Sequence, residues 1–189
     1  MTTFDNNKNI RFEIVDTYSR WTALSATRSG SPLKSRDDIY SLLEGVDFKT
    51  ILVSDSNITK TEFNQWHEKT AKSMNVIRPE MQIGWTTKII NVYLKTMVYV
   101  GQFGCSDLLR HIHPPIDKGL LDGLKEKFKD DSFISQTINF KTLIKDIKSY
   151  EDYAKIIATL ELIAIKEKCL LIEVEQFWQG TKFRTQNGR

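Results

Sequence analysis

The sequence predicts an all-α fold with about eight helices, and three features of the chain lead to that prediction. Apolar residues recur at helical spacing through most of its 189 residues. Serine, threonine and aspartate precede many of these stretches, and glycine or proline follows them, as at helix starts and ends. No Asn-Gly turn lies between two alternating apolar runs, so no β-hairpin is expected.

The length fits a single compact helical domain over residues 1–189, either undivided or with two closely packed lobes. We expect flexible ends at about residues 1–9 and 181–189, because chain termini are poorly ordered unless they are tied down. The last nine residues are also basic, which fits either a solvated end or a tail that contacts DNA.

The first half of the chain contains four predicted helices, at about residues 11–27, 36–44, 60–74 and 83–100. Ser35 is suited to begin the second helix, and Gly45 to end it. Thr59 and Glu62 have the spacing of a capping box at the start of the third. The apolar run at residues 51–53 predicts a short strand or an extended link.

The second half predicts further helices separated by prolines and polar clusters. Ser106 or Asp107 can begin a short helix that ends at Pro114, and Pro115 suits the first turn of the next one. A helix or broken helix is expected to reach Lys148. The last two predicted helices begin at Ser149 and span Leu170 to Trp178.

The central predicted helix is almost entirely apolar, so it should be buried. Its strongly polar residues are Lys88, Asn91 and Lys95, and the two lysines are seven residues apart, nearly in line along the helix. A buried lysine is costly unless it is paired or gives up its proton, and an unprotonated amine is a nucleophile.

The Pro114-Pro115-Ile116-Asp117 turn places a carboxylate at the start of the following helix. Lys88 and Asp117 are therefore a candidate catalytic pair. We expect both side chains to face one cleft, with their charged atoms about 4–8 Å apart so that a substrate group fits between them.

The segment from Gly84 to Lys95, together with the turn ending at Asp117, resembles the catalytic segment of the helix-hairpin-helix DNA glycosylases. The divergent archaeal 8-oxoguanine branch is the most similar. That superfamily places a lysine at the start of an apolar helix and, after a loop, an aspartate preceded by a proline and an aliphatic residue. The resemblance covers about 35 residues. Similar Lys-x-x-Asn-x-x-Leu-Lys and Pro-x-Asp patterns occur in uncharacterised bacterial proteins and assign no function.

The resemblance implies a DNA base-excision glycosylase and abasic-site lyase with a helix-hairpin-helix fold, acting on duplex DNA with a damaged or modified base. Lys88 matches the lysine that attacks the sugar C1′ and forms a Schiff base, and Asp117 matches the aspartate that stabilises positive charge on the sugar. The structural alternatives are a lysine whose stem packs in the core and an aspartate that stabilises the first helical turn.

Six further residues are candidates for binding substrate or DNA. In this superfamily a Leu-Pro-Gly-Val-Gly hairpin holds a DNA phosphate, and here the corresponding stretch is Met81-Gln82-Ile83-Gly84-Trp85, with a single glycine. Asn91 and Lys95 either line the pocket or make a buried hydrogen bond and a surface charge. His113 either orients Asp117 or bonds to backbone. The candidates are Gly84, Trp85, Asn91, Lys95, Arg110 and His113.

A base extracted from duplex DNA is held by aromatic stacking, for which the chain offers Trp85, Tyr99, Phe103 and Trp178. Arg110 and the lysines after Asp117 are suited to DNA phosphates, although interspersed acidic residues also fit a solvated helix face. The net charge of +3 permits nucleic-acid contact without requiring it.

Composition excludes several other classes. Cys105 and Cys169 form no Cys-x-x-Cys pattern, and His111 and His113 lack further ligands at a recognisable spacing, so neither a metal nor another cofactor is expected. No apolar run is long enough for a membrane span and no signal peptide is evident, so a cytoplasmic protein is expected. The alternative function is a non-catalytic helical module of a bacterial system that binds nucleic acid or a protein partner.

Overall fold

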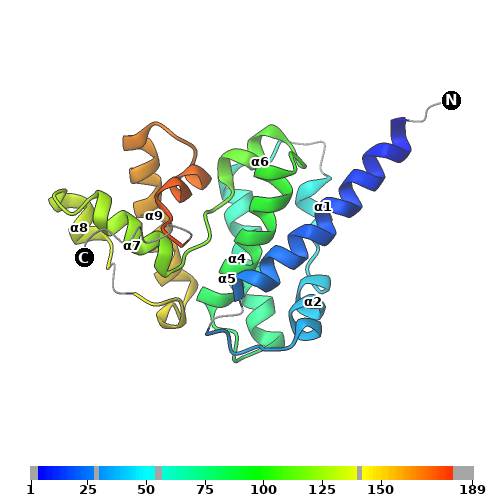
Figure 1. Ribbon diagram of the computed structural model, residues 1–189, viewed down its shortest axis with the longest axis horizontal. Helices are drawn as coiled ribbons and strands as arrows, with labels where there is room; N and C mark the ends of the chain where they lie inside the picture. Colours follow the sequence, from blue (N-terminus) through cyan, green and yellow to red (C-terminus); the bar gives the residue numbers. More distant parts are fainter. Residues whose placement is uncertain (1–3, 28–29, 54–56, 140–141, 181–189) are drawn as a thin grey trace, which may run out of the picture.

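The computed structural model describes residues 4–27, 30–53, 57–139 and 142–180, with side chains from Ile10 onward. The predicted all-α fold is confirmed, and the described residues contain no strand (Figure 1). The α-helices are α1 (Phe4–Thr27), α2 (Arg36–Glu44), α3 (Lys49–Leu52), α4 (Lys60–Ile77), α5 (Ile83–Leu94), α6 (Ser106–His111), α7 (Lys118–Lys127), α8 (Ser132–Thr137) and α9 (Tyr150–Glu167). A π-helical turn, η1 (Lys95–Val100), continues α5, and two 3-10 segments are η2 (Ile144–Asp146) and η3 (Leu171–Phe177).

Several helices begin at the capping side chains from which the sequence predicts their start. Thr59 and Glu62 form the capping box of α4: the Thr59 hydroxyl accepts from the Glu62 amide at 3.2 Å, and the Glu62 carboxylate from the Thr59 amide at 2.8 Å. Ser35 accepts from the amides of the first turn of α2, and Ser149 does the same for α9. These local bonds satisfy amide groups that have no partner inside the helix.

Four predicted elements differ in the structure. Residues 51–53 lie at the end of the short helix α3 rather than in a strand, because the Asp47 carboxylate accepts from the Thr50 amide and starts a helical turn. The predicted last helix is the 3-10 segment η3, and α6 has Cys105 at its N-cap. Helix α1 begins at Phe4 rather than at about residue 11, so it includes residues 4–9, whose flexibility stays a prediction. Residues 1–3 and 181–189 lie outside the described part.

The buried apolar side chains form two clusters, here called the first core and the second core. Helices α1 to α6 supply most of the first core, and α7, α8 and α9 supply most of the second. In Figure 1 the helices α7, α8 and α9 lie together on one side, and α1, α2, α4, α5 and α6 on the other. Helix α5 adjoins both groups, because Ile83 at its start belongs to the second core.

Gly84 allows the chain to pack closely at the start of α5. A Cβ atom on Gly84 would lie 2.0 Å from the carbonyl oxygen of Ile144, and the Gly84 amide donates to the Ile147 carbonyl at 2.9 Å. The segment around η2 therefore rests directly on the backbone of α5. All residues of α5 are buried except Lys88, so the helix brings a single charged side chain to the boundary between the cores.

Candidate active site

Lys88 and Asp117 meet at the boundary between the two cores. The Lys88 Nζ lies 3.4 Å from the Asp117 Oδ2, and the two side chains are 11% and 22% exposed. The pair is closer than the 4–8 Å expected from the sequence, because the two groups contact each other directly with no space between them for a substrate atom. An amine and a carboxylate that are both mostly shielded from solvent therefore meet, although they come from different helices.

Asp117 is held by two hydrogen bonds to its other oxygen. It is the N-cap of α7, and its Oδ1 accepts from the Leu120 amide at 3.0 Å. The same oxygen accepts from the Trp178 indole N–H at 3.0 Å. Asp117 thus has the structural role of a helix cap while its Oδ2 stays directed at Lys88.

Trp178 reaches Asp117 because two residues of α7 are glycines at the place where residues 177–179 cross that helix. A Cβ on Gly119 would lie 2.6 Å from the Trp178 Nε1, and a Cβ on Gly123 would lie 1.7 Å from the Phe177 carbonyl oxygen. The Gln179 amide also donates to the Gly119 carbonyl at 3.2 Å. The two glycines, four residues apart on α7, are the sequence signal that could have indicated this contact.

A second ion pair lies one residue beyond the end of α5. The Lys95 Nζ is 2.7 Å from the Glu175 Oε1, with side chains 30% and 19% exposed. Burial raises the pKa of the Glu175 carboxyl above its ordinary value, and the neighbouring Asp117 acts in the same direction, while Lys95 and Lys88 oppose the change. The sequence predicts the alignment of the two lysines, whereas no sequence signal points to Glu175.

A hollow of about 660 Å³ adjoins the Lys95–Glu175 pair and is here called the Trp178 hollow. Its link to the Lys88–Asp117 pair is Trp178, whose indole N–H bonds to Asp117. Lys95 and Glu175 lie in its wall, and η1, η3 and the end of α9 supply the rest. Its lining residues are Lys95, Tyr99, Val100, Glu167, Cys169, Ile172, Glu173, Glu175, Gln176 and Trp178. Of the four aromatic side chains considered for base stacking, Tyr99 and Trp178 line this hollow.

Asn91 occupies the centre of a buried polar network rather than a pocket wall. Its Nδ2 donates to the Pro114 carbonyl at 3.1 Å, which fixes the orientation of the amide. Its Oδ1 therefore accepts from the His67 Nε2 at 2.8 Å. The bond to Pro114 links α5 to the turn that carries Asp117, so Asn91 makes the buried hydrogen bond that the sequence left as one alternative.

The rest of the network follows from this orientation. Because His67 donates through Nε2, its Nδ1 accepts from the Tyr150 hydroxyl at 2.9 Å. The Tyr153 hydroxyl accepts from the Asn91 Nδ2 at 2.9 Å and donates to the His113 Nδ1 at 2.9 Å. His113 thus bonds to a side chain of α9, neither to backbone nor to Asp117 as the sequence alternatives had it, because its ring is buried beside Tyr153.

Burial keeps both histidines neutral. It lowers the pKa of His67 from 6.5 to about 4, against a smaller opposing effect of the hydrogen bond to Asn91. Burial also lowers the pKa of His113 well below its ordinary value, and the nearby His67 adds to that effect. Burial raises the pKa of Tyr153 well above its ordinary value. The network is therefore uncharged at neutral pH.

The remaining candidates have other roles in the structure. The Gly84 amide already donates to a backbone carbonyl and is not available to a phosphate. Trp85 is buried in the first core. Arg110 is 69% exposed on α6, with its guanidinium 3.7 Å from the Asp107 carboxylate. Phe103 packs against Phe12 at the edge of the first core.

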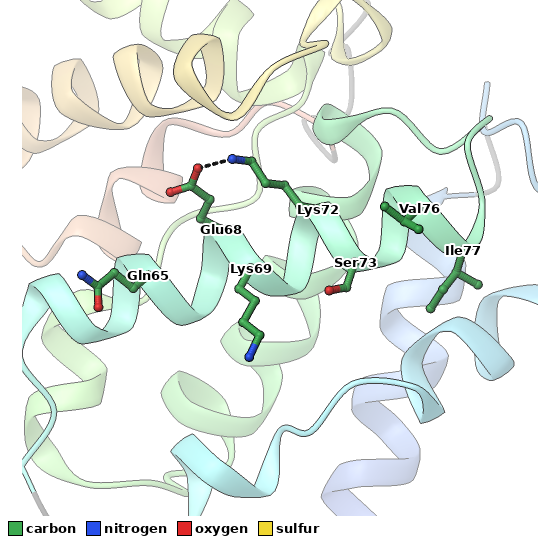
Figure 2. A pocket seen from close by; sticks show the side chains of 7 residues that line it. All are labelled: Gln65, Glu68, Lys69, Lys72, Ser73, Val76 and Ile77. Carbon is green, nitrogen blue, oxygen red and sulfur yellow. Dashed lines mark ion pairs between the residues drawn. The ribbon is translucent and has the colours of Figure 1, made fainter.

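Figure 2 shows another hollow, of about 620 Å³, along α4. The seven described lining residues belong to that one helix, and two of its three charged members, Glu68 and Lys72, pair with each other at 2.6 Å. Val76 and Ile77 are exposed at its end. Among the described residues, no element other than α4 lines this hollow, so it does not have the converging groups of a binding site.

Within the described ranges, no group of three or more histidine, cysteine, aspartate or glutamate side chains is arranged to hold a metal ion. None of the described helices is both long and apolar enough to cross a membrane. Comparisons of this chain with models of known protein families, with curated proteins and with solved structures found no match.

Proposed function

We propose that the protein is a DNA base-excision glycosylase and abasic-site lyase in which Lys88 is the nucleophile and Asp117 assists it. The single observation that carries the proposal is the contact between the Lys88 amine and the Asp117 carboxylate at 3.4 Å, where the two cores meet. A lysine and an aspartate brought together from distant positions match, in type and order, the pattern on which the glycosylase resemblance rests.

The chemistry requires an amine that has lost its proton. The Asp117 Oδ2 is the nearest acceptor for that proton, while its Oδ1 stays bound to the Leu120 amide and the Trp178 indole. The Lys88 nitrogen then forms a bond to C1′ as the bond from C1′ to the base breaks, and the bonding electrons leave with the base. The attached nitrogen then loses a proton, and its lone pair forms the C=N bond as the C1′–O4′ bond breaks. O4′ takes the electrons of that bond and a proton, and the resulting Schiff base is the species from which the lyase step proceeds.

The extruded base needs a place beside this pair, and the Trp178 hollow offers one. Tyr99 and Trp178 present aromatic surface there, and Trp178 also contacts Asp117 directly. In this proposal the two cores correspond to two lobes, and the nucleotide would be held between them. Helix η1, which borders the hollow, is a π-helical turn, a local irregularity that is frequent at functional sites.

A non-catalytic nucleic-acid-binding or partner-binding module is the second candidate, and one observation favours it. The Gly84 amide is used inside the protein, and the segment around η2 covers the start of α5. This helix start therefore does not offer the free amides with which a hairpin would hold DNA phosphate. Under this alternative, Lys88 and Asp117 form a structural ion pair.

The test is reduction with borohydride in the presence of duplex DNA containing an abasic site, because the reagent converts a Schiff base into a stable adduct. Wild-type protein should be trapped, and Lys88→Ala and Lys88→Gln should not, since neither side chain carries an amine. Glutamine keeps a donor for Asp117 and so tests chemistry separately from folding. Lys60→Ala is the matched control, because Lys60 also forms an ion pair between helices, with Glu161 at 2.6 Å.

Loss of the adduct only in the Lys88 variants supports the proposal, whereas an unchanged adduct in those variants overturns it. DNA binding that weakens with salt and yields no adduct favours the non-catalytic nucleic-acid module. Absence of DNA binding favours the partner-binding module.

A further inference from the structure

Glu175 is a half-buried carboxylate that the Lys88–Asp117 chemistry does not use. Its Oε1 is held by the Lys95 Nζ at 2.7 Å, while its Oε2 has no hydrogen-bond partner among the described residues. The side chain lines the Trp178 hollow and lies close enough to Asp117 and Lys88 for their charges to act on it. One oxygen of Glu175 is thus bound by Lys95, whereas the other has no such bond and belongs to a side chain that lines the hollow.

A base that is uncharged in DNA needs a proton as it departs, and the proposed mechanism does not assign Asp117 to supply it. The base takes the electrons of the C1′–N bond, and it leaves as an anion unless a proton reaches it. Asp117 accepts the proton of Lys88 in the proposed mechanism, and its Oδ1 is already bound by two N–H groups. A second acid on the side of the base would supply that proton directly.

We propose that Glu175, in its acid form, is a catalytic residue that donates the proton from its Oε2 to the departing base. This inference rests on the proposed glycosylase function. The proton passes from Oε2 to the base as the C1′–N electron pair moves onto the base and the Lys88 nitrogen bonds to C1′. Glu175 is left as a carboxylate, which the Lys95 ammonium stabilises through the existing contact to Oε1.

The surroundings of Glu175 suit this role. Burial favours the uncharged acid, as the raised pKa of the Glu175 carboxyl indicates, and a base filling the hollow would remove more water from it. Lys95 favours the carboxylate that remains after proton transfer. The surroundings of Glu175 therefore suit both its acid form before the transfer and its carboxylate after it. The inference also narrows the substrate class: Glu175 is needed for an uncharged base, and not for a base with a fixed positive charge, which leaves as a neutral molecule.

The experiment separates base release from Schiff-base formation. Duplexes carrying 8-oxoguanine, hypoxanthine, uracil or N7-methylguanine measure base release in a single turnover, and a duplex with an abasic site measures borohydride trapping. Trapping on the abasic site needs Lys88 but no leaving base. Glu175→Gln should therefore keep that trapping within about twofold and lose about 100-fold or more in release of an uncharged base, the usual range for general acid catalysis.

In wild-type protein the rate of uncharged-base release should fall at high pH as Glu175 loses its proton, and Glu175→Gln should lack that fall. Release of N7-methylguanine, if it occurs, should change little in the variant. The control is Glu161→Gln, which removes another carboxylate paired with a lysine and should leave release and trapping unchanged.

Equal loss of trapping and release in Glu175→Gln, or unchanged release of an uncharged base, would overturn the role of Glu175. Wild-type protein that is trapped on the abasic site but releases none of the four bases also overturns it, with the lyase chemistry of Lys88 intact. Wild-type protein that is not trapped at all refutes the proposed function, and this inference with it.

Discussion

Acidification should destabilise the protein through His67, and the size of the effect can be worked from its burial. The pKa of His67 is lowered from 6.5 to about 4 in the folded protein. Between these values the unfolded chain binds a proton that the folded state does not, so the free energy of unfolding falls as pH falls. His67 contributes its full stability above pH 6.5. Each pH unit below that costs about 1.4 kcal/mol, or about 2 kcal/mol by pH 5.

The assay is urea unfolding of wild-type protein and His67→Gln at pH 7.5 and pH 5. Glutamine can still donate to Asn91 but does not titrate, so the stability difference between the two proteins should shrink by about 2 kcal/mol at pH 5. His113 adds to the pH dependence of both proteins in the same direction. Ser149→Ala, which removes the N-cap of α9, should keep a constant difference of about 1 kcal/mol from wild type. A constant difference for His67→Gln as well would refute the reasoning.

Three substitutions test the packing and capping that position the site. Gly84→Ala should destabilise the protein by about 2 kcal/mol or more, because the new Cβ would lie 2.0 Å from a carbonyl oxygen; thermal unfolding measures this. Gly123→Ala should push the Phe177 backbone off α7 and alter the near-ultraviolet circular dichroism of Trp178. Thr59→Ala should cost about 1 kcal/mol in urea unfolding through loss of the capping box of α4, and no loss would contradict its role.

The parts of the fold that sequence predicted are those governed by neighbours along the chain. The helix starts at Ser35, Thr59 and Ser149 depend on a side chain and an amide two or three residues away, so local spacing was enough. Residues 51–53 could not be assigned in this way, because a short apolar run fits a buried strand and a buried helix equally. The helical outcome depends on the Asp47 side chain, which lies outside that run.

In the candidate site too, the features predicted from the sequence are the local ones. The line of Lys88 and Lys95 along one helix follows from helical geometry, and both make ion pairs with the second half of the chain. Glu175 and Trp178 each lie about 60 residues or more beyond their partners in sequence, which are Lys95 for Glu175 and Asp117 for Trp178. Only tertiary packing brings each of them to its partner. The absence of side chains on Gly119 makes that approach possible, but a lone sequence does not say which segment will use the space.

The network around Asn91 determines how accurately the pair can be held. Asn91 lies one turn beyond Lys88 on α5, and its amide bonds to the carbonyl of Pro114, three residues before Asp117. The same amide is oriented by His67 from α4 and by Tyr153 from α9, so three helices fix the turn that presents the carboxylate. A change that breaks this network should therefore move Asp117 relative to Lys88 as well as destabilise the core. For that reason, loss of trapping in an Asn91 variant would say nothing about direct contact with DNA, whereas substitutions at Lys88 and Glu175 leave the network intact.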